Sequence, residues 1–376
     1  MASKIDTAGF ASSTAKEPAR AVSSLRFDWI MVVVSIWWLG GLFIDGWAHS
    51  NIPQLETFFT PWHAVFYSGY LAVAFTLLVQ ILFNLRKSAI NAGGSASSLI
   101  TLVRESLPGN RWLQAIPDGY ELSVLGLVIF GISGIGDMTW HLILGIERGT
   151  EALLSPTHLG LAMGIGLALS GPLRAAWHRP GTNPSWRQLG PAIFSLTFTF
   201  SLLTFFTAYA SPLIAPWPII NASSSPSRGI TEILLITAVS MSFVLLALRR
   251  WRLPFGTLTF MFGVNGALMV VFFPHALLVS VPTALLGGLA ADVLYRFLQP
   301  SVDQPMSVRL FAFLVPLVFY SLYLVDLAIV GPIIFQSGIL WSAPFWAGTP
   351  VIAGIAGFLL SFVMLPPAQP AEERNS

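Results

Sequence analysis

Two stretches of this chain carry the same carboxylate and imidazole side chains at nearly the same spacing. Each stretch reads Asp-x3-His, then Glu-x6-His, and its last histidine stands in a Thr/Ser-Pro-x-His turn. The first copy is Asp45, His49, Glu56 and His63, and the second is Asp137, His141, Glu151 and His158. Four of the six histidines in the chain therefore belong to one repeated pattern.

The spacing within each copy points to a metal site. Residues four apart lie on one face of a helix, so Asp45 with His49, and Asp137 with His141, present a carboxylate and an imidazole to one point. Nitrogen and carboxylate ligands suit copper, iron or zinc, and the chain has no cysteine to add a thiolate. The pattern thus predicts ligands at Asp45, His49, His63, Asp137, His141 and His158, of which the first five would form the active centre.

The turn before each later histidine predicts a helix start. Thr or Ser at the N-cap with Pro at the first helical position is a favoured beginning, as in Thr60-Pro61 and Ser155-Pro156. The histidine two residues after each proline then lies in the first turn, where the helix dipole disfavours imidazolium. Neutral imidazole is the form that binds metals. The glutamates, Glu56 and Glu151, are candidates for orienting these rings through the other ring nitrogen.

The composition around these motifs is that of a membrane protein. The chain has 376 residues, of which 55% are hydrophobic and 10% charged, with a mean hydropathy of +0.73. Soluble domains carry about 25% charged residues, and several apolar runs exceed the length of about 18 residues that indicates a spanning helix. We therefore expect an all-α, polytopic integral membrane helix bundle. The net charge of +2 gives no basic surface for nucleic acid.

About ten spanning segments are expected. Residues 1–26 and 367–376 are predicted to be cytoplasmic tails, the first disordered; 27–178 is predicted to be a four-helix region with the metal site, and 189–366 to hold further spanning helices. The segments are 27–49, 61–85, 118–143, 155–177, 189–213, 229–250, 256–275, 278–298, 307–331 and 347–366.

The distribution of basic residues predicts the orientation. With the N-terminus inside, all 19 Lys and Arg residues except Arg148 and Arg228 fall on the inner side, as the positive-inside rule requires. This predicts a multi-pass protein of a bacterial-type inner (plasma) membrane with both termini in the cytoplasm. The first and third segments then run the same way, so the two copies form a parallel repeat with its site at the outer face.

The first copy resembles a known enzyme family. Asp45-x3-His49, followed by Glu-Thr-Phe-Phe-Thr-Pro-Trp-His and Ala-Val-Phe-Tyr, is similar to the C subunit of the copper-dependent membrane monooxygenases, the particulate methane and ammonia monooxygenases. The second copy looks like that subunit's next hairpin, where an Asn-x3-His helix end leads to a Pro-x-His turn. Asp137 stands where the family has asparagine, and the likeness covers only about residues 27–170.

The resemblance implies copper, O2 and hydroxylation of unreactive substrates. It implies one copper site at Asp45, His49 and His63, and a neighbouring site at Asp137 and His141 that shares His63. His158 matches a family histidine without an assigned ligand role. The expected function is a copper-dependent monooxygenase, or a subunit of one, that acts on a small or lipid-soluble substrate at the outer membrane face, with membrane lipid and partner subunits or further copies of the chain around it.

Two alternatives and one further residue stay open. A metal-handling transporter would use the same cluster for transient ion binding, and a structural subunit of a membrane complex would use it for stability.

Asp326 lies within an apolar segment, where a carboxylate is costly and faces a partner or a cavity. It is either part of a proton path or hydrogen-bonded to Tyr320 or Tyr323.

Overall fold

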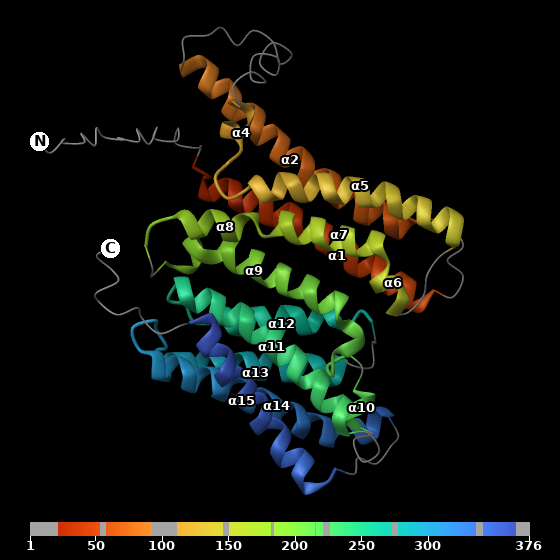
Figure 1. Cartoon of the computed structure of the whole chain (residues 1–376), viewed down its shortest axis with the longest axis vertical. Coiled ribbons are helices and arrows are strands. Elements are labelled where there is room, and N and C mark those ends of the chain that lie inside the picture. The colour runs from red at the N-terminus through yellow and green to blue at the C-terminus, as the bar shows by residue number, and fades with distance from the viewer. Residues whose placement is uncertain are drawn as a thin grey trace, which may run out of the picture. The chain divides into compact units, whose positions relative to one another are not determined.

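The structure is a computed structural model in which the described residues are almost entirely helical (Figure 1). It describes residues 22–52, 58–91, 111–145, 150–181, 184–214, 216–220, 226–272, 277–335 and 341–365. The predicted tails lie almost wholly outside these ranges. Among the described residues, nine helices are long and apolar enough to cross a membrane, which confirms the all-α polytopic architecture.

These nine helices follow the predicted segments in order. They are α1 (Leu25–Asn51), α2 (Pro61–Asn91), α5 (Glu121–Leu144), α7 (Pro156–Leu169) continued by α8 (Gly171–His178), α9 (Trp186–Phe206), α11 (Pro226–Arg250), α13 (Leu277–Leu298), α14 (Pro305–Phe335) and α15 (Ala343–Met364). The short helices are α4 (Arg111–Ala115), α6 (Thr150–Leu154), the 3-10 turn η1 (Ala208–Ala210) and α10 (Trp217–Ile220).

Three segments differ from their predicted form. The segment predicted at 256–275 contains α12 (Thr257–Met269), whose 13 residues are fewer than a spanning helix needs. The segment at 155–177 breaks at Ser170, because Pro172 follows and cannot donate a backbone hydrogen bond. The segment at 189–213 ends earlier, at Phe206, where the chain turns into η1.

The chain divides into two compact units, Met1–Val22 with Gln80–Pro117, and Ser23–Val79 with Asp118–Ser376. In the first, the Asn84 side-chain amide donates to the carbonyl of Ala115, which ties the end of α2 to α4 at 2.8 Å. Both copies of the Asp/His motif lie in the second unit.

The motif copies lie on two helical hairpins, α1 with α2 and α5 with α7. Each hairpin crosses at a glycine six residues after its later histidine. A Cβ at Gly69 would lie 2.5 Å from the Cα of Trp38, and a Cβ at Gly164 would lie 2.7 Å from the carbonyl oxygen of Gly126. Only glycine permits this backbone approach, a common device in membrane helices. The close crossing holds the end of the first helix against the start of the second.

Phe130 of α5 joins the two hairpins. Its ring is fully buried and contacts four aromatic rings of the first hairpin, with centroid distances of 4.9 Å to Trp38, 5.5 Å to Phe66, 5.6 Å to Tyr67 and 4.6 Å to Tyr70. The Tyr70 hydroxyl also donates to the carbonyl of Leu127 at 3.2 Å. Phe130 lies two helical turns before Asp137, so this packing sets the distance between the two motif copies.

The remaining helices form a second layer of the same unit. Helix α9 packs against α1, α7 and α8 on one side and against α11 and α12 on the other, and α12 to α15 pack in sequence. The Asp292 carboxylate accepts from the backbone N–H groups of Leu258 and Thr259, at 3.2 and 2.8 Å, and so caps α12. This layer places the end of α9 and the end of α12 beside the first hairpin.

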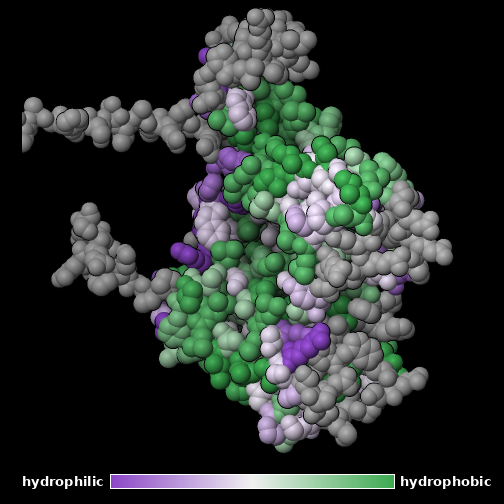
Figure 2. All heavy atoms as spheres, turned by 45° about the vertical axis from the view of Figure 1, so that its right-hand side comes forward, coloured by the Kyte–Doolittle hydropathy of each residue, from purple (hydrophilic) through white to green (hydrophobic). Residues whose placement is uncertain are grey.

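The outer surface of the helices is apolar. Green, hydrophobic side chains cover most of the coloured surface in Figure 2. Ile132, Ile135 and Leu142 of α5 are between 66% and 68% exposed. Water does not favour such a continuous apolar surface, which is typical of contact with lipid.

Candidate metal centres

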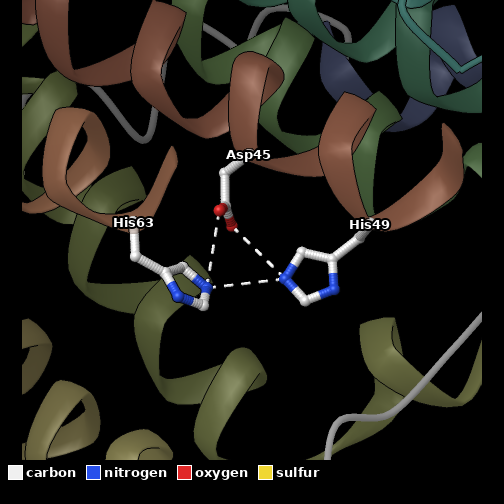
Figure 3. Close-up of side chains that lie close together, drawn as sticks. All are labelled: Asp45, His49 and His63. Atoms are coloured by element: carbon white, nitrogen blue, oxygen red, sulfur yellow. Dashed lines mark hydrogen bonds and ion pairs between the residues drawn. The ribbon is translucent and has the colours of Figure 1, made fainter. Parts of the chain in front are cut away.

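The first copy brings one carboxylate and two imidazoles together at the junction of α1 and α2 (Figure 3). The Nε2 atom of His49 lies 3.7 Å from Asp45 Oδ2, and the Nε2 atom of His63 lies 3.4 Å from Asp45 Oδ1. The two Nε2 atoms are 3.4 Å apart. All three side chains therefore point their ligand atoms at one small volume.

The second copy forms a matching group at the junction of α5 and α7. Asp137 Oδ1 lies 3.5 Å from the Nε2 atom of His141 and 3.4 Å from the Nε2 atom of His158. The same oxygen accepts a hydrogen bond from the hydroxyl of Thr157 at 3.1 Å, which fixes the carboxylate. We call these two groups the first triad (Asp45, His49, His63) and the second triad (Asp137, His141, His158).

The distances suit a small metal ion. Two ligand atoms that are each about 2.05 Å from a tetrahedral metal lie about 3.3 Å from each other. The measured separations, 3.4 to 3.7 Å, are slightly longer than that edge. Three protein ligands leave a fourth position for water or a reactant, which is the arrangement of catalytic rather than structural sites.

Hydrogen bonds to the other ring nitrogen prepare the histidines for metal binding. The Nδ1 atom of His63 lies 2.5 Å from the carbonyl of Phe58, and the Nδ1 atom of His141 lies 3.2 Å from the carbonyl of Gly145. A carbonyl only accepts, so each Nδ1 carries the proton and each Nε2 keeps its lone pair. In the second triad, the Ser155 hydroxyl lies 2.5 Å from Nδ1 of His158.

One buried histidine nitrogen has no hydrogen-bond partner from the described part of the protein. The Nε2 atom of His141 is buried and has no hydrogen-bond partner among the described residues. A buried polar atom without a partner is costly, and such atoms are rare in native structures. A cation bound between this nitrogen and Asp137 would satisfy both, so the residues of the second triad fit a metal ion.

Burial differs between the triads. The side chains of Asp137 and His141 are 2% and 1% exposed, whereas those of Asp45 and His49 are 13% and 16% exposed. The third ligands reverse this order, because the His63 side chain is 7% exposed and the His158 side chain is 19% exposed. The second triad is therefore enclosed at Asp137 and His141 and more accessible at His158.

The two triads lie side by side, as the parallel repeat predicts. The ring of His141 lies 6.4 Å from that of His49 and 6.3 Å from that of His63, between centroids. Its separation from the ring of His158 is shorter, at 5.6 Å. The geometry thus groups His158 with Asp137 and His141. The shared role that the resemblance implies for His63 stays a prediction.

Both helix starts are confirmed. The Ser155 side chain accepts from the backbone N–H of His158 and caps α7, whose first residue is Pro156. The Thr60 side chain accepts from the backbone N–H of His63 at 3.1 Å, at the start of α2. These caps fix each later histidine in the first turn of its helix, where it meets the end of the preceding one.

Both triads border a cavity of about 620 Å³. Asp45, His49, His63, Asp137 and His158 line one part of it. The other lining residues are mostly apolar. They come from α1, α2, α6, α7, the end of α9, η1 and the segments after η1 and α12, and include Leu42, Phe66, Leu161, Ile165, Phe205, Phe206, Ile214 and Phe272. A polar cluster at the wall of an apolar pocket is the usual form of an active or binding site.

The other predicted site residues have different outcomes. Glu56 and the side chain of Glu151 lie outside the described residues, so their predicted role stays a prediction. Asp326 of α14 accepts from the hydroxyl of Thr283 at 2.9 Å. The expected bond to Tyr320 or Tyr323 is wrong, because these hydroxyls donate to the carbonyls of Ile233 and Pro212. Asp326 does not line the cavity.

Sequence reasoning missed Tyr67 as a site residue. It lines the cavity one helical turn after His63, and its hydroxyl is buried without a hydrogen-bond partner among the described residues. Its ring packs on Phe130 at 5.6 Å. The i, i+4 spacing from His63 was the available signal.

Comparison with protein-family models, with curated proteins and with solved structures gives no match to the chain.

Proposed function

We propose that this membrane protein is a copper-dependent monooxygenase, or a subunit of one, which hydroxylates a small or lipid-soluble substrate with O2. The observation that carries the proposal is the pair of adjacent Asp-His-His triads on the wall of one apolar cavity. Two ligand sets that can hold a redox-active metal, next to an apolar cavity, suit oxidation of an unreactive molecule better than they suit binding of a structural ion.

The chain's own residues would bind and orient the metals. Asp45 and Asp137 would each supply one negative charge, and four neutral imidazoles would supply the remaining donors. The carbonyls of Phe58 and Gly145 hold two of the rings in the binding tautomer before any metal arrives. Such supporting bonds are worth about 10- to 100-fold in metal affinity.

Copper is favoured within the set of possible metals. Imidazole and carboxylate ligands without sulfur also accept zinc and iron. Copper bound by such ligands supplies one-electron redox chemistry and reacts with O2. The resemblance of the first copy to the copper monooxygenases supports the same choice, and it rests on the residues from Asp45 to Tyr67.

The reaction needs an external reductant. In a hydroxylation, one oxygen atom of O2 enters a C–H bond of the substrate and the other leaves as water, which consumes two electrons and two protons from a donor. The electrons would come from a membrane-soluble or partner-bound donor. The apolar cavity would hold the substrate and exclude bulk water from the reacting carbon.

The cavity lining also bears on the transporter alternative. An ion path would continue from the triads through polar side chains. Beyond the triads the lining is instead mostly apolar and includes Leu42, Phe66, Leu161 and Ile165, with Tyr67 as a polar exception. Apolar side chains do not replace the water molecules that a cation would lose on entering this part of the cavity. The lining therefore favours an apolar substrate over ion passage.

The test combines metal analysis with isotope incorporation. Protein in lipid nanodiscs is dialysed against copper, zinc or ferrous iron, and metal per chain is measured by mass spectrometry. The copper-loaded form is then given a hydroquinone reductant, ¹⁸O2 and a panel of alkanes, alkenes and terpenes. We expect two copper ions per chain and ¹⁸O-labelled alcohols, both absent in the His49→Ala/His141→Ala double variant and both retained in His178→Ala.

The outcomes separate the alternatives. His178 is a matched control because it pairs with Asp118 at 2.9 Å, outside both triads. Copper binding without labelled alcohol from any substrate would favour the metal-handling alternative. Failure to bind any of the three metals would overturn the proposal.

A further inference from the structure

The cavity beside the triads has a polar end and a long apolar body. On α1, the lining residues run from Asn51 and Ser50 through His49 and Asp45 to Leu42, and on α7 from His158 through Leu161 to Ile165. His49 and Leu42, like His158 and Ile165, are seven residue steps apart, which is roughly 10 Å of helix at 1.5 Å per residue. The ligand atoms stand at one end of both runs, and buried aliphatic side chains stand at the other.

The opposite wall is aromatic and comes from outside the motif region. Phe205 and Phe206 end α9, and Phe272 follows α12. The ring of Phe205 packs on those of Phe43 and Phe272, at 5.0 and 4.9 Å between centroids. These helices carry no ligand for the triads, so their contribution is the wall itself.

This aromatic wall contacts α1 next to the first triad. A Cβ on Gly46 would lie 2.7 Å from two ring carbons of Phe205, so this ring occupies the space that any other residue would need. Gly46 is the neighbour of Asp45 in α1. The aromatic wall and the carboxylate ligand are therefore fixed relative to each other.

The size of the cavity suits a drug-sized ligand better than a gas-sized one. Its volume of about 620 Å³ is within the range of roughly 300–1,000 Å³ that holds drug-sized ligands. It is roughly twenty times the 30 Å³ share of one water molecule in the liquid. A one- or two-carbon molecule would make few contacts in it.

We infer that the substrate is an elongated lipophilic molecule, such as a hydrocarbon chain or a terpenoid ring system, which extends roughly 10 Å from the triads along the helices. The inference rests on the proposed function and narrows its substrate class. The apolar body packs between Leu161, Ile165 and the rings of Phe205 and Phe206, and the reacting end lies at the triads. The second helical layer thus forms the substrate-binding wall.

The test uses photolabelling of the metal-free protein, so it does not depend on catalysis. A decanol that carries a diazirine is added to the full chain in nanodiscs, and the labelled peptides are mapped by mass spectrometry. Lipid-facing residues such as Ile132 and Ile135 take up label as a non-saturable reference, because both are exposed. We expect an additional, saturable label on the peptides that hold Leu42–His49 and Phe205–Phe206.

A matched pair of variants locates that label. Leu161→Trp fills the middle of the cavity, whereas Leu159→Trp adds the same side chain on the exposed side of α7. Leu161→Trp should lower the saturable label at least about tenfold, the change that 1.4 kcal/mol of lost binding free energy produces. Leu159→Trp should leave it unchanged.

Two results would overturn the inference. One is equal labelling in both variants, and the other is a label confined to the lipid-facing reference. If Leu161→Trp does not fold, competition on the unmodified chain decides: unlabelled decanol should displace the label, and butane at the same free concentration should not. Saturable labelling together with an absence of labelled alcohols from the copper-loaded protein would reject the proposed function and keep the binding site. Hydroxylation without saturable labelling would reject the binding site and keep the proposed function.

Discussion

Removing one histidine from each triad tests whether the triads bind metal independently. In His63→Ala, Asp45 and His49 remain as a two-ligand remnant, and in His158→Ala, Asp137 and His141 remain. Each lost Nε2 atom lies 3.4 Å from the carboxylate of its own triad. We therefore expect each variant to lose one of two metal ions.

The size of the effect follows from what supports each ligand. Loss of a supporting partner alone costs about 10- to 100-fold in metal affinity, and loss of the ligand itself should cost more. At free metal about tenfold above the wild-type Kd, a triad weakened more than about 100-fold is almost empty while the intact one is almost filled. The assay is metal per chain after dialysis, measured by mass spectrometry, with helicity and Tm recorded to show that the helices stay folded.

The alternative arrangement gives a different pattern. If His63 serves both metals, as the resemblance implies, His63→Ala loses both ions and His158→Ala loses neither. Full retention of metal in both variants would refute the assignment of the triads as metal centres. His178→Ala, outside both triads, should keep the wild-type content in every case.

Four further predictions follow from individual contacts. Asp137→Asn, which introduces the residue of the resembling family, should weaken the second site without emptying the first, as metal titration would show, since the amide keeps the oxygen but not the charge. Gly164→Ala should lower the free energy of unfolding by about 1–3 kcal/mol and disturb the second triad, because the added Cβ would lie 2.7 Å from a backbone oxygen. In the same denaturation assay, the control Gly40→Ala should be neutral, because a Cβ at Gly40 meets nothing within 4 Å. Tyr67→Phe should change Tm little or raise stability by up to about 1 kcal/mol, since its hydroxyl has no partner among the described residues, and a larger loss would reveal one. A single cysteine at Ile52, at the end of α1, should react with an impermeant reagent from outside, as the distribution of basic residues predicts, and labelling only from the inside would reverse the orientation.

The sequence alone determined the features that depend on local chemistry. Long apolar runs cannot be solvated, so they predicted the all-α membrane bundle. The i, i+4 pairs Asp45/His49 and Asp137/His141 share helix faces wherever those helices go. The Thr60-Pro61 and Ser155-Pro156 caps act on their own helix starts, so the positions of His63 and His158 in a first turn were also predictable.

The tertiary structure decided which of these groups meet. Chain spacing does not say whether His63 or His158 completes the second triad, because the answer depends on how the hairpins pack around Phe130. The carbonyls of Phe58 and Gly145 that orient two of the rings carry no signal in the sequence, since every residue has a carbonyl.

The cavity is the clearest case of a feature that only folding creates. Its aromatic wall joins Phe205 and Phe272 to a helix more than 150 residues earlier, at Gly46. In the sequence these phenylalanines are ordinary members of apolar segments. They become part of a cavity wall because α9 and α12 pack beside α1, which is a long-range contact that no local pattern records.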